Sequence, residues 1–152
     1  MESRTLTPAS AAATIGLEDV ARLRQAVMRL ARRLRQQSSG DATPSQLAVL
    51  GALARRGPTS PGVLAAEEQV QPPSMTGIID RLAEKGLVVR TPAPVDGRSQ
   101  LVSLTPAGKR LVSGIRSQRN AWLAVRLRNL DGDDAADLRR GIAALERILD
   151  DG

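Results

Sequence analysis

Residues 72–108 read PPSMTGIIDRLAEKGLVVRTPAPVDGRSQLVSLTPAG, and this stretch decides the fold. Its first part repeats apolar residues at helical spacing, which predicts a helix over residues 72–85 with one buried face. That face consists of Met75, Ile78, Ile79 and Leu82. Two short strand-like segments follow, at 87–91 and 99–104, and a polar loop joins them. A helix followed by a β-hairpin is therefore predicted.

Helix start signals recur on both sides of this stretch. Residues 43–46 (TPSQ) combine an N-cap threonine, a proline at the first helical position and a glutamine three residues after the cap, as in a capping box. The pairs Ser-Pro at 60–61 and Thr-Pro at 105–106 repeat the cap and the proline, and Asp131 begins the last helix. Helix ends are expected at Gly40, Gly57 and Gly86. The expected helices are 17–37, 44–56, 61–69, 72–85, 106–130 and 132–150.

The composition predicts an aliphatic, helix-packed core. The 152-residue chain has one Trp, no Phe and no Tyr, so Leu, Val, Ile and Ala must fill the interior. In the second and third helices the expected core residues are Leu47, Leu50, Leu53, Val63, Leu64 and Ala65. Three short helices followed by a hairpin form a winged helix-turn-helix. The predicted fold class is mainly α with a two-stranded β-wing.

The missing residue types exclude several function classes. Without Cys or His, the chain can form no disulfide, no Cys- or His-ligated metal site and no Ser-His-Asp or Cys-His catalytic arrangement. We therefore expect no enzymatic activity, no metal and no cofactor. No apolar run is long enough to cross a membrane, and residues 1–16 lack the features of a signal peptide. Those residues are expected to be a flexible tail on a cytoplasmic protein.

The net charge of +6 is unevenly distributed. Residues 17–40 carry six arginines against two acids, and residues 106–130 carry six basic residues and no acid. The last segment, 131–152, has seven acids against three arginines, while residues 41–105 balance six against six. Most of these charges are expected to be solvated helix faces, so the basic excess alone is weak support for DNA binding.

The helix at 72–85 has a second, polar face that suits the DNA major groove. Helical spacing directs it outward when the apolar face packs on the core. The outward residues are Pro73, Gly77, Asp80, Arg81 and Glu84, with Ser74 and Thr76 beside them. Hydroxyl groups bond base edges or phosphates, and an arginine pairs with phosphate or guanine. The alternative is an ordinary surface helix.

The hairpin tip carries an arginine that suits the minor groove. An arginine at the end of a short hairpin can enter a narrow minor groove, where the negative potential is strongest. This predicts Arg98 as the inserted residue, with Asp96 holding its guanidinium group and Gly97 permitting the tight backbone. The alternative is a solvated turn with an incidental ion pair.

These segments resemble the MarR family of transcription regulators. The resemblance spans about residues 17–149 and rests on "DRL", "KGLV", the wing pattern D-x-R and "LTPAG", together with "TPSQLAVLGALARRGPTSPGVLA" at 43–65. It implies a homodimer that binds a pseudo-palindromic operator in double-stranded DNA. It also implies a helical dimerisation domain, made of residues 17–40 and 106–152, and a winged helix-turn-helix domain at 41–105. Arg98 would be the minor-groove residue, and Ser74, Thr76 and Arg81 would contact the operator.

The resemblance further implies a repressor that responds to a small aromatic or phenolic acid. Trp122 and arginines of the first helix are candidates for the lining of its pocket, but a tryptophan that packs the dimer core is the favoured interpretation. Gly77 departs from the long polar residue of many relatives, and as a glycine it would permit close approach of the backbone to DNA. The main rival function is a winged-helix dimer that binds another protein without sequence-specific DNA binding.

Overall fold

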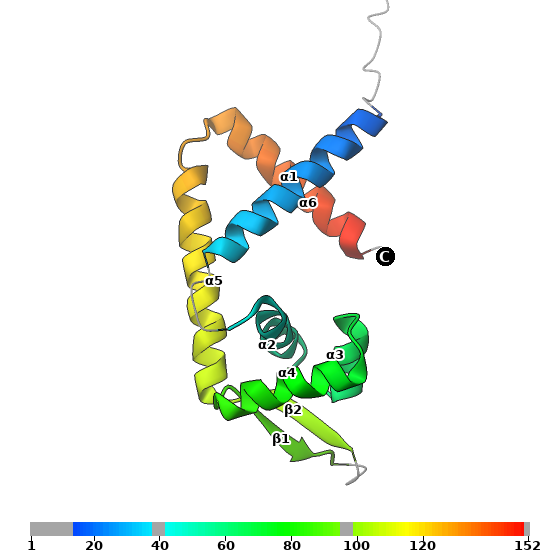
Figure 1. Cartoon of the computed structure of the whole chain (residues 1–152). Coiled ribbons are helices and arrows are strands. Elements are labelled where there is room, and N and C mark those ends of the chain that lie inside the picture. The colour runs from blue at the N-terminus through cyan, green and yellow to red at the C-terminus, as the bar shows by residue number, and fades with distance from the viewer. Residues whose placement is uncertain (1–13, 38–41, 95–98, 151–152) are drawn as a thin grey trace, which may run out of the picture. The chain divides into compact units, whose positions relative to one another are not determined.

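The computed structural model describes residues 14–37, 42–94 and 99–150, and the chain divides into two compact units, Met1–Gln36 and Gln37–Gly152. The first unit contains one helix, α1 (Leu17–Gln36). The second unit contains all the other described elements (Figure 1). They are α2 (Pro44–Arg56), α3 (Pro61–Glu67), α4 (Pro72–Glu84), β1 (Val88–Pro92), β2 (Gln100–Leu104), α5 (Pro106–Leu127) and α6 (Gly132–Asp150). The predicted element order and fold class are confirmed.

Most of the predicted helix caps form. Thr43 and Gln46 make a complete capping box at α2, with Thr43 Oγ1 accepting from the Gln46 N–H at 3.3 Å and Gln46 Oε1 accepting from the Thr43 N–H at 3.1 Å. Ser60, Thr105 and Asp131 each accept from a backbone N–H in the first turn of α3, α5 and α6. These bonds satisfy donors that have no partner inside the helix, so the local sequence sets where each helix begins.

The helix ends differ from the prediction by a few residues. Gly57 and Gly86 follow α2 and α4 with φ of 80° and 68°, a backbone region that favours glycine, whereas Gly40 lies outside the described residues. The third helix ends at Glu67, two residues early, and Gln69 adopts φ of 52° in the connection to α4. The fifth helix ends at Leu127, three residues before its predicted end.

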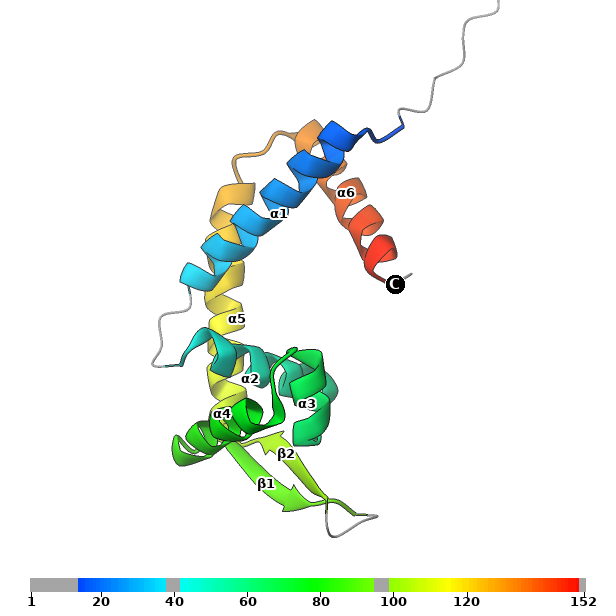
Figure 2. The same cartoon turned by 45° about the vertical axis from the view of Figure 1, so that its right-hand side comes forward.

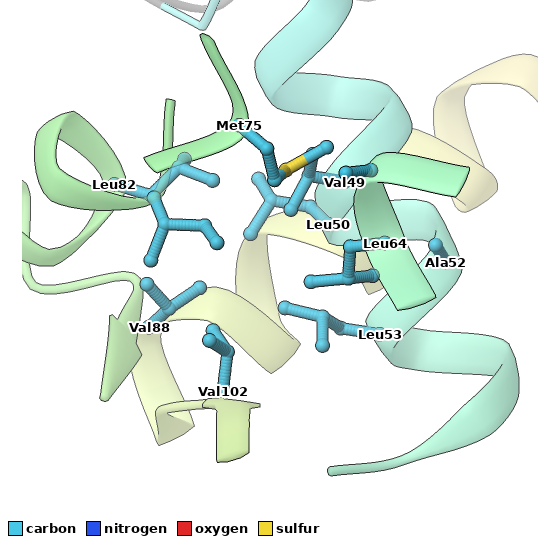
Figure 3. Packing of buried hydrophobic residues seen from close by; sticks show 11 residues of the cluster. Val49, Leu50, Ala52, Leu53, Leu64, Met75, Leu82, Val88 and Val102 are labelled. Atoms are coloured by element: carbon cyan, nitrogen blue, oxygen red, sulfur yellow. The ribbon is translucent and has the colours of Figure 1, made fainter. Parts of the chain in front are cut away.

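The described core lies in the winged domain and is aliphatic, apart from one methionine (Figure 3). Its buried residues are Val49, Leu50, Ala52, Leu53, Leu64, Ala65, Met75, Ile79, Leu82, Val88 and Val102. Leu47 and Ile78 are half-buried against this cluster. The prediction of Val63 as a core residue is wrong, because its side chain is 45% exposed. The short helix α3 directs only Leu64 and Ala65 inward.

The hairpin is antiparallel, and a third segment extends it. β1 pairs with β2 in the register Val88 opposite Leu104 and Arg90 opposite Val102. Thr59, in the connection between α2 and α3, exchanges two backbone hydrogen bonds with Val102, at 3.0 and 2.8 Å. The sequence analysis did not predict this pairing. It ties the inner strand of the wing to the helix-turn-helix.

Two helices present apolar side chains that no described residue buries. In α1 the row Leu17, Val20, Leu23, Val27 and Leu30 is 42–90% exposed, and no residue of this helix is buried. In α6, likewise without a buried residue, the most exposed apolar side chains are Ile142, Ile148 and Leu149. Exposed apolar rows on this scale are typical of surfaces that bind another protein.

One carboxylate joins the end of α2 to α3. Glu67 accepts a hydrogen bond from Arg55 at 3.1 Å and one from Arg56 at 2.5 Å. The bond from Arg55 lowers the pKa of Glu67, partial burial opposes it, and the bond from Arg56 and the two positive charges add to the lowering. Glu67 therefore remains ionised to lower pH when the chain is folded than when it is unfolded.

Replacing Glu67 with glutamine is expected to lower the urea midpoint of unfolding at pH 7. Because the folded pKa is depressed, the carboxylate stabilises the fold above the ordinary Glu value of 4.5 and loses this effect as the pH falls through the folded pKa. The difference in urea midpoint between wild type and Glu67→Gln should therefore narrow as the pH falls below 4.5. Glu68→Gln removes the same charge one residue away and is the control. A difference in urea midpoint that stays constant with pH would contradict the lowered pKa of Glu67.

Candidate nucleic-acid interface

The helix α4 exposes the residues predicted to contact DNA. Met75, Ile79 and Leu82 are fully buried, so the opposite face of the helix is turned outward. Pro73, Ser74, Thr76 and Arg81 are exposed, and Gly77 is half-buried. A Cβ added at Gly77 would meet nothing within 4 Å, so packing among the described residues does not require glycine there. The structure thus brings five of the seven predicted contact residues onto one surface.

The N-terminus of α4 offers fewer backbone donors than a typical helix. Pro72 and Pro73 have no N–H, and the N–H of Met75 donates to the Gln71 carbonyl at 3.1 Å. Ser74 supplies the remaining N–H of this turn, and its hydroxyl is exposed beside it. The Thr76 hydroxyl donates to the Pro72 carbonyl at 3.1 Å, which leaves its oxygen as an acceptor. This turn can therefore hold one phosphate or contact one base edge, mainly through Ser74.

An ion pair that the sequence analysis missed connects α4 to the wing. The Arg90 Nη2 of β1 lies 2.6 Å from the Asp80 Oδ1 of α4. Figure 2 shows α4 beside the start of this hairpin. Asp80 was expected on the outward face, but only the position of the strand relative to the helix reveals its partner. The pair neutralises a carboxylate that would otherwise face DNA phosphates, and it constrains the angle of the wing.

The wing tip lies outside the described residues. Asp96, Gly97 and Arg98 belong to the undescribed stretch 95–98, so their predicted roles stay predictions. The last described bond of the hairpin runs from the Ala93 N–H to the Ser99 carbonyl at 2.8 Å. The ladder therefore continues beyond β1 and β2 up to the residues that flank this tip.

Trp122 lies on α5, where it contacts an arginine of its own helix. The ring is half-buried, the Arg126 guanidinium carbon lies 3.6 Å from the ring centroid, and Arg126 donates to the Trp122 carbonyl at 2.9 Å. A cation over the face of an indole is a favourable contact. The predicted effector pocket at Trp122 stays a prediction.

The described residues contain no group of three or more acidic side chains placed to hold a metal ion. Among their helices, none is long and apolar enough to cross a membrane.

Three short helices, an exposed helix face and a hairpin tied to it define a winged helix-turn-helix protein. The model of the MarR family matches residues 41–99. The uncharacterized HTH-type transcriptional regulator ML2140 of Mycobacterium leprae is 44% identical over 127 residues, covering 83% of this chain and 89% of its own length. The chain therefore belongs to the MarR family and is a DNA-binding transcription regulator.

Two other proteins resemble this chain. Wild-type MarR from E. coli, in its apo form, superposes with a TM-score of 0.68 at 27% identity, covering 87% of this chain and 98% of that one. The HTH-type transcriptional repressor MdtR of Bacillus subtilis is 34% identical over 82 residues, which is 54% of this chain and 53% of its own. The structural match extends beyond the winged domain, whereas the match to MdtR covers about half of each chain.

Breaking the pair between Asp80 and Arg90 is expected to weaken DNA binding more than folding. Arg90→Met leaves an unpaired carboxylate on the DNA-facing surface and releases the wing, so we expect about tenfold weaker binding to DNA. An exposed ion pair contributes only about 0–1 kcal/mol to stability, so the melting temperature should change little. The swapped variant Asp80→Arg with Arg90→Asp should recover part of the affinity. Equal DNA affinity of Arg90→Met and wild type would show that the pair does not position the wing.

Proposed function

We propose that the protein is a homodimeric repressor, acting on DNA in the cytoplasm, that binds a pseudo-palindromic operator. Each subunit would place α4 in a major groove, with the two recognition helices about one DNA turn, ~34 Å, apart. The observation that carries the proposal is the exposed face of α4, whose Ser74, Thr76 and Arg81 can all bond DNA. The name of MdtR, a repressor whose match covers about half of this chain, supports repression over activation.

The dimer is proposed from the exposed apolar rows of α1 and α6. These helices have no buried residue among the described part of the chain, and a second copy would cover their apolar side chains. We assign residues 17–40 and 106–152 to the dimerisation domain and residues 41–105 to the winged domain. Two winged domains on one dimer suit a two-fold operator.

The proposal includes a response to a small aromatic or phenolic acid and no catalytic reaction. The half-buried indole of Trp122, with the Arg126 cation over its face, is the feature that supports an effector of this class. A chain with neither His nor Cys lacks the residues that most often act as general base or nucleophile. Binding of the effector would change the spacing of the two recognition helices and so release the operator.

Arg98→Ala is the variant that tests the wing. Loss of a minor-groove arginine is expected to weaken operator binding by about 1–3 kcal/mol while the dimer stays intact. Binding is measured by fluorescence anisotropy and the dimer by light scattering. Arg139→Ala removes one exposed positive charge from α6 and is the control. If Arg98→Ala binds the operator with the affinity of the wild type, Arg98 is not the minor-groove residue.

A further inference from the structure

The end of α4 and the start of α5 are joined by one threonine hydroxyl. Thr105 Oγ1 donates to the Gly86 carbonyl at 2.6 Å and accepts from the Gly108 N–H at 3.1 Å. The backbone N–H of Thr105 donates to the Leu87 carbonyl at 3.1 Å. Gly86 and Leu87 follow the last turn of α4, and Gly108 lies in the first turn of α5. A single residue therefore bonds to both helix ends.

The two bonds of this hydroxyl do different things. A hydroxyl has one hydrogen to donate and two lone pairs that accept. The bond that Thr105 Oγ1 accepts from the Gly108 N–H caps α5, as the sequence predicts for a threonine before a proline. The bond that it donates to Gly86 satisfies no group of α5. Capping does not require this second bond, so it has another consequence, which is to hold the end of α4 against α5.

The end of α4 is also held on a second side, by α2. Lys85, the C-cap residue of α4, donates from Nζ to the Gln46 Oε1 at 3.3 Å. Gln46 is buried, and the same oxygen accepts from the Thr43 N–H at 3.1 Å. At the other end of α4, the N-cap residue Gln71 makes no side-chain capping bond. Side-chain hydrogen bonds to neighbouring elements thus fix the end of α4 from which the wing continues.

We propose that the Thr105 hydroxyl is a positioning group for DNA recognition, which holds α4 at a fixed angle to α5. The inference rests on the proposed contact of α4 with the operator. Ser74 lies about 16 Å from Lys85 along the helix axis. A tilt of about 10° at the joint would therefore displace Ser74 by about 3 Å, which is enough to break a hydrogen bond to a base or a phosphate.

The variants of the test separate the donated bond from the cap. Thr105→Asp keeps an acceptor for the Gly108 N–H but has no hydrogen to give the Gly86 carbonyl. Thr105→Gly removes the donor without adding a charge, and glycine costs little as a helix cap. Thr105→Ser keeps both bonds. Pro106→Asp adds the same negative charge one residue away, leaves the Thr105 hydroxyl in place and is the control for charge.

DNA binding of the full chain is measured by fluorescence anisotropy. The probe is a duplex that the wild type selects from a pool of random sequences, and a scrambled duplex of the same composition is the reference. We expect Thr105→Asp and Thr105→Gly to lose about tenfold of the preference for the selected duplex. Thr105→Ser and Pro106→Asp should stay within about twofold of wild type.

Amide hydrogen exchange without DNA measures the joint itself. The N–H groups of Lys85, Gly86 and Leu87 close the end of α4 through bonds to carbonyls of its last turn. In Thr105→Asp these three amides should exchange faster than in wild type, while the capped first turn of α5 keeps its protection. A hydroxyl that acted on stability alone would lower the melting temperature and leave the preference for the selected duplex unchanged.

Three results would overturn the proposal. They are a wild-type preference in both Thr105→Asp and Thr105→Gly, a loss in Pro106→Asp equal to that in Thr105→Asp, and a loss of the same size in Thr105→Ser. A wild type that selects no duplex would instead overturn the proposed function, and this outcome does not depend on any of the variants.

Discussion

Replacing Gly108 with alanine is expected to lower the free energy of unfolding by about 3 kcal/mol, because no room exists for a side chain there. A Cβ at this position would lie 2.1 Å from the Leu87 carbonyl oxygen and 3.3 Å from Leu104. The Leu87 oxygen is backbone and also accepts the N–H of Thr105 at 3.1 Å, so it cannot move away without breaking the junction between β2 and α5. Denaturant unfolding of the two proteins measures the difference.

Gly114→Ala is the matched control for that variant. Gly114 lies further along the same helix, and a Cβ added there would meet nothing within 4 Å. Alanine is favoured over glycine inside a helix by about 0.5–1 kcal/mol, so this variant should be slightly more stable than wild type. If Gly108→Ala lowers the free energy of unfolding and Gly114→Ala raises it, the loss at Gly108 comes from close packing and not from helix propensity. Two variants of equal stability would show that α5 does not pack on Leu87 as described.

Removing residues 131–152 is expected to abolish the proposed dimer and leave monomers or aggregates. The deletion takes away α6 and its exposed apolar side chains, among them Ile142 at 45% and Leu149 at 78% exposure. The apolar row of α1 would then lose the partner that the proposed dimer requires. Size-exclusion chromatography with light scattering reports the mass directly.

A point variant keeps this prediction independent of any damage from the truncation. Ile142→Asp places a charge in the apolar row of α6 and should dissociate the dimer, since burial of an unpaired charge is strongly unfavourable. Arg139→Asp puts the same new side chain at an exposed position of α6 and should leave the dimer intact. If the truncated chain is a soluble and well-folded dimer, the proposed dimerisation domain is wrong.

Local signals predicted the parts of the fold that local chemistry controls. The capping pairs at Thr43, Ser60 and Thr105 marked helix starts correctly, because a cap needs only residues within one turn. The polar face of α4 followed from helical periodicity and was confirmed by the burial of Met75 and Leu82 on the other side.

Contacts between distant segments could not be predicted in this way. The pairing of Thr59 with Val102 joins residues 43 positions apart, and no periodicity signals it. The ion pair between Asp80 and Arg90 depends on the angle between a helix and a strand. Likewise, the glycine of "LTPAG" was visible as a motif, but the reason for it, contact with the Leu87 carbonyl, required the register of the hairpin. The sequence pattern overestimated the length of α3, and this short helix leaves Val63 exposed.

The most direct test of the account is binding of the purified protein to the intergenic DNA upstream of its own gene, titrated with salt beside a scrambled duplex. Fluorescence anisotropy gives the affinity at each salt concentration. We expect tight binding to the upstream DNA alone, with an affinity that falls steeply as salt rises, because each phosphate contact releases counterions. Weak binding to both duplexes with no dependence on salt would contradict the account and favour a winged-helix dimer that binds another protein.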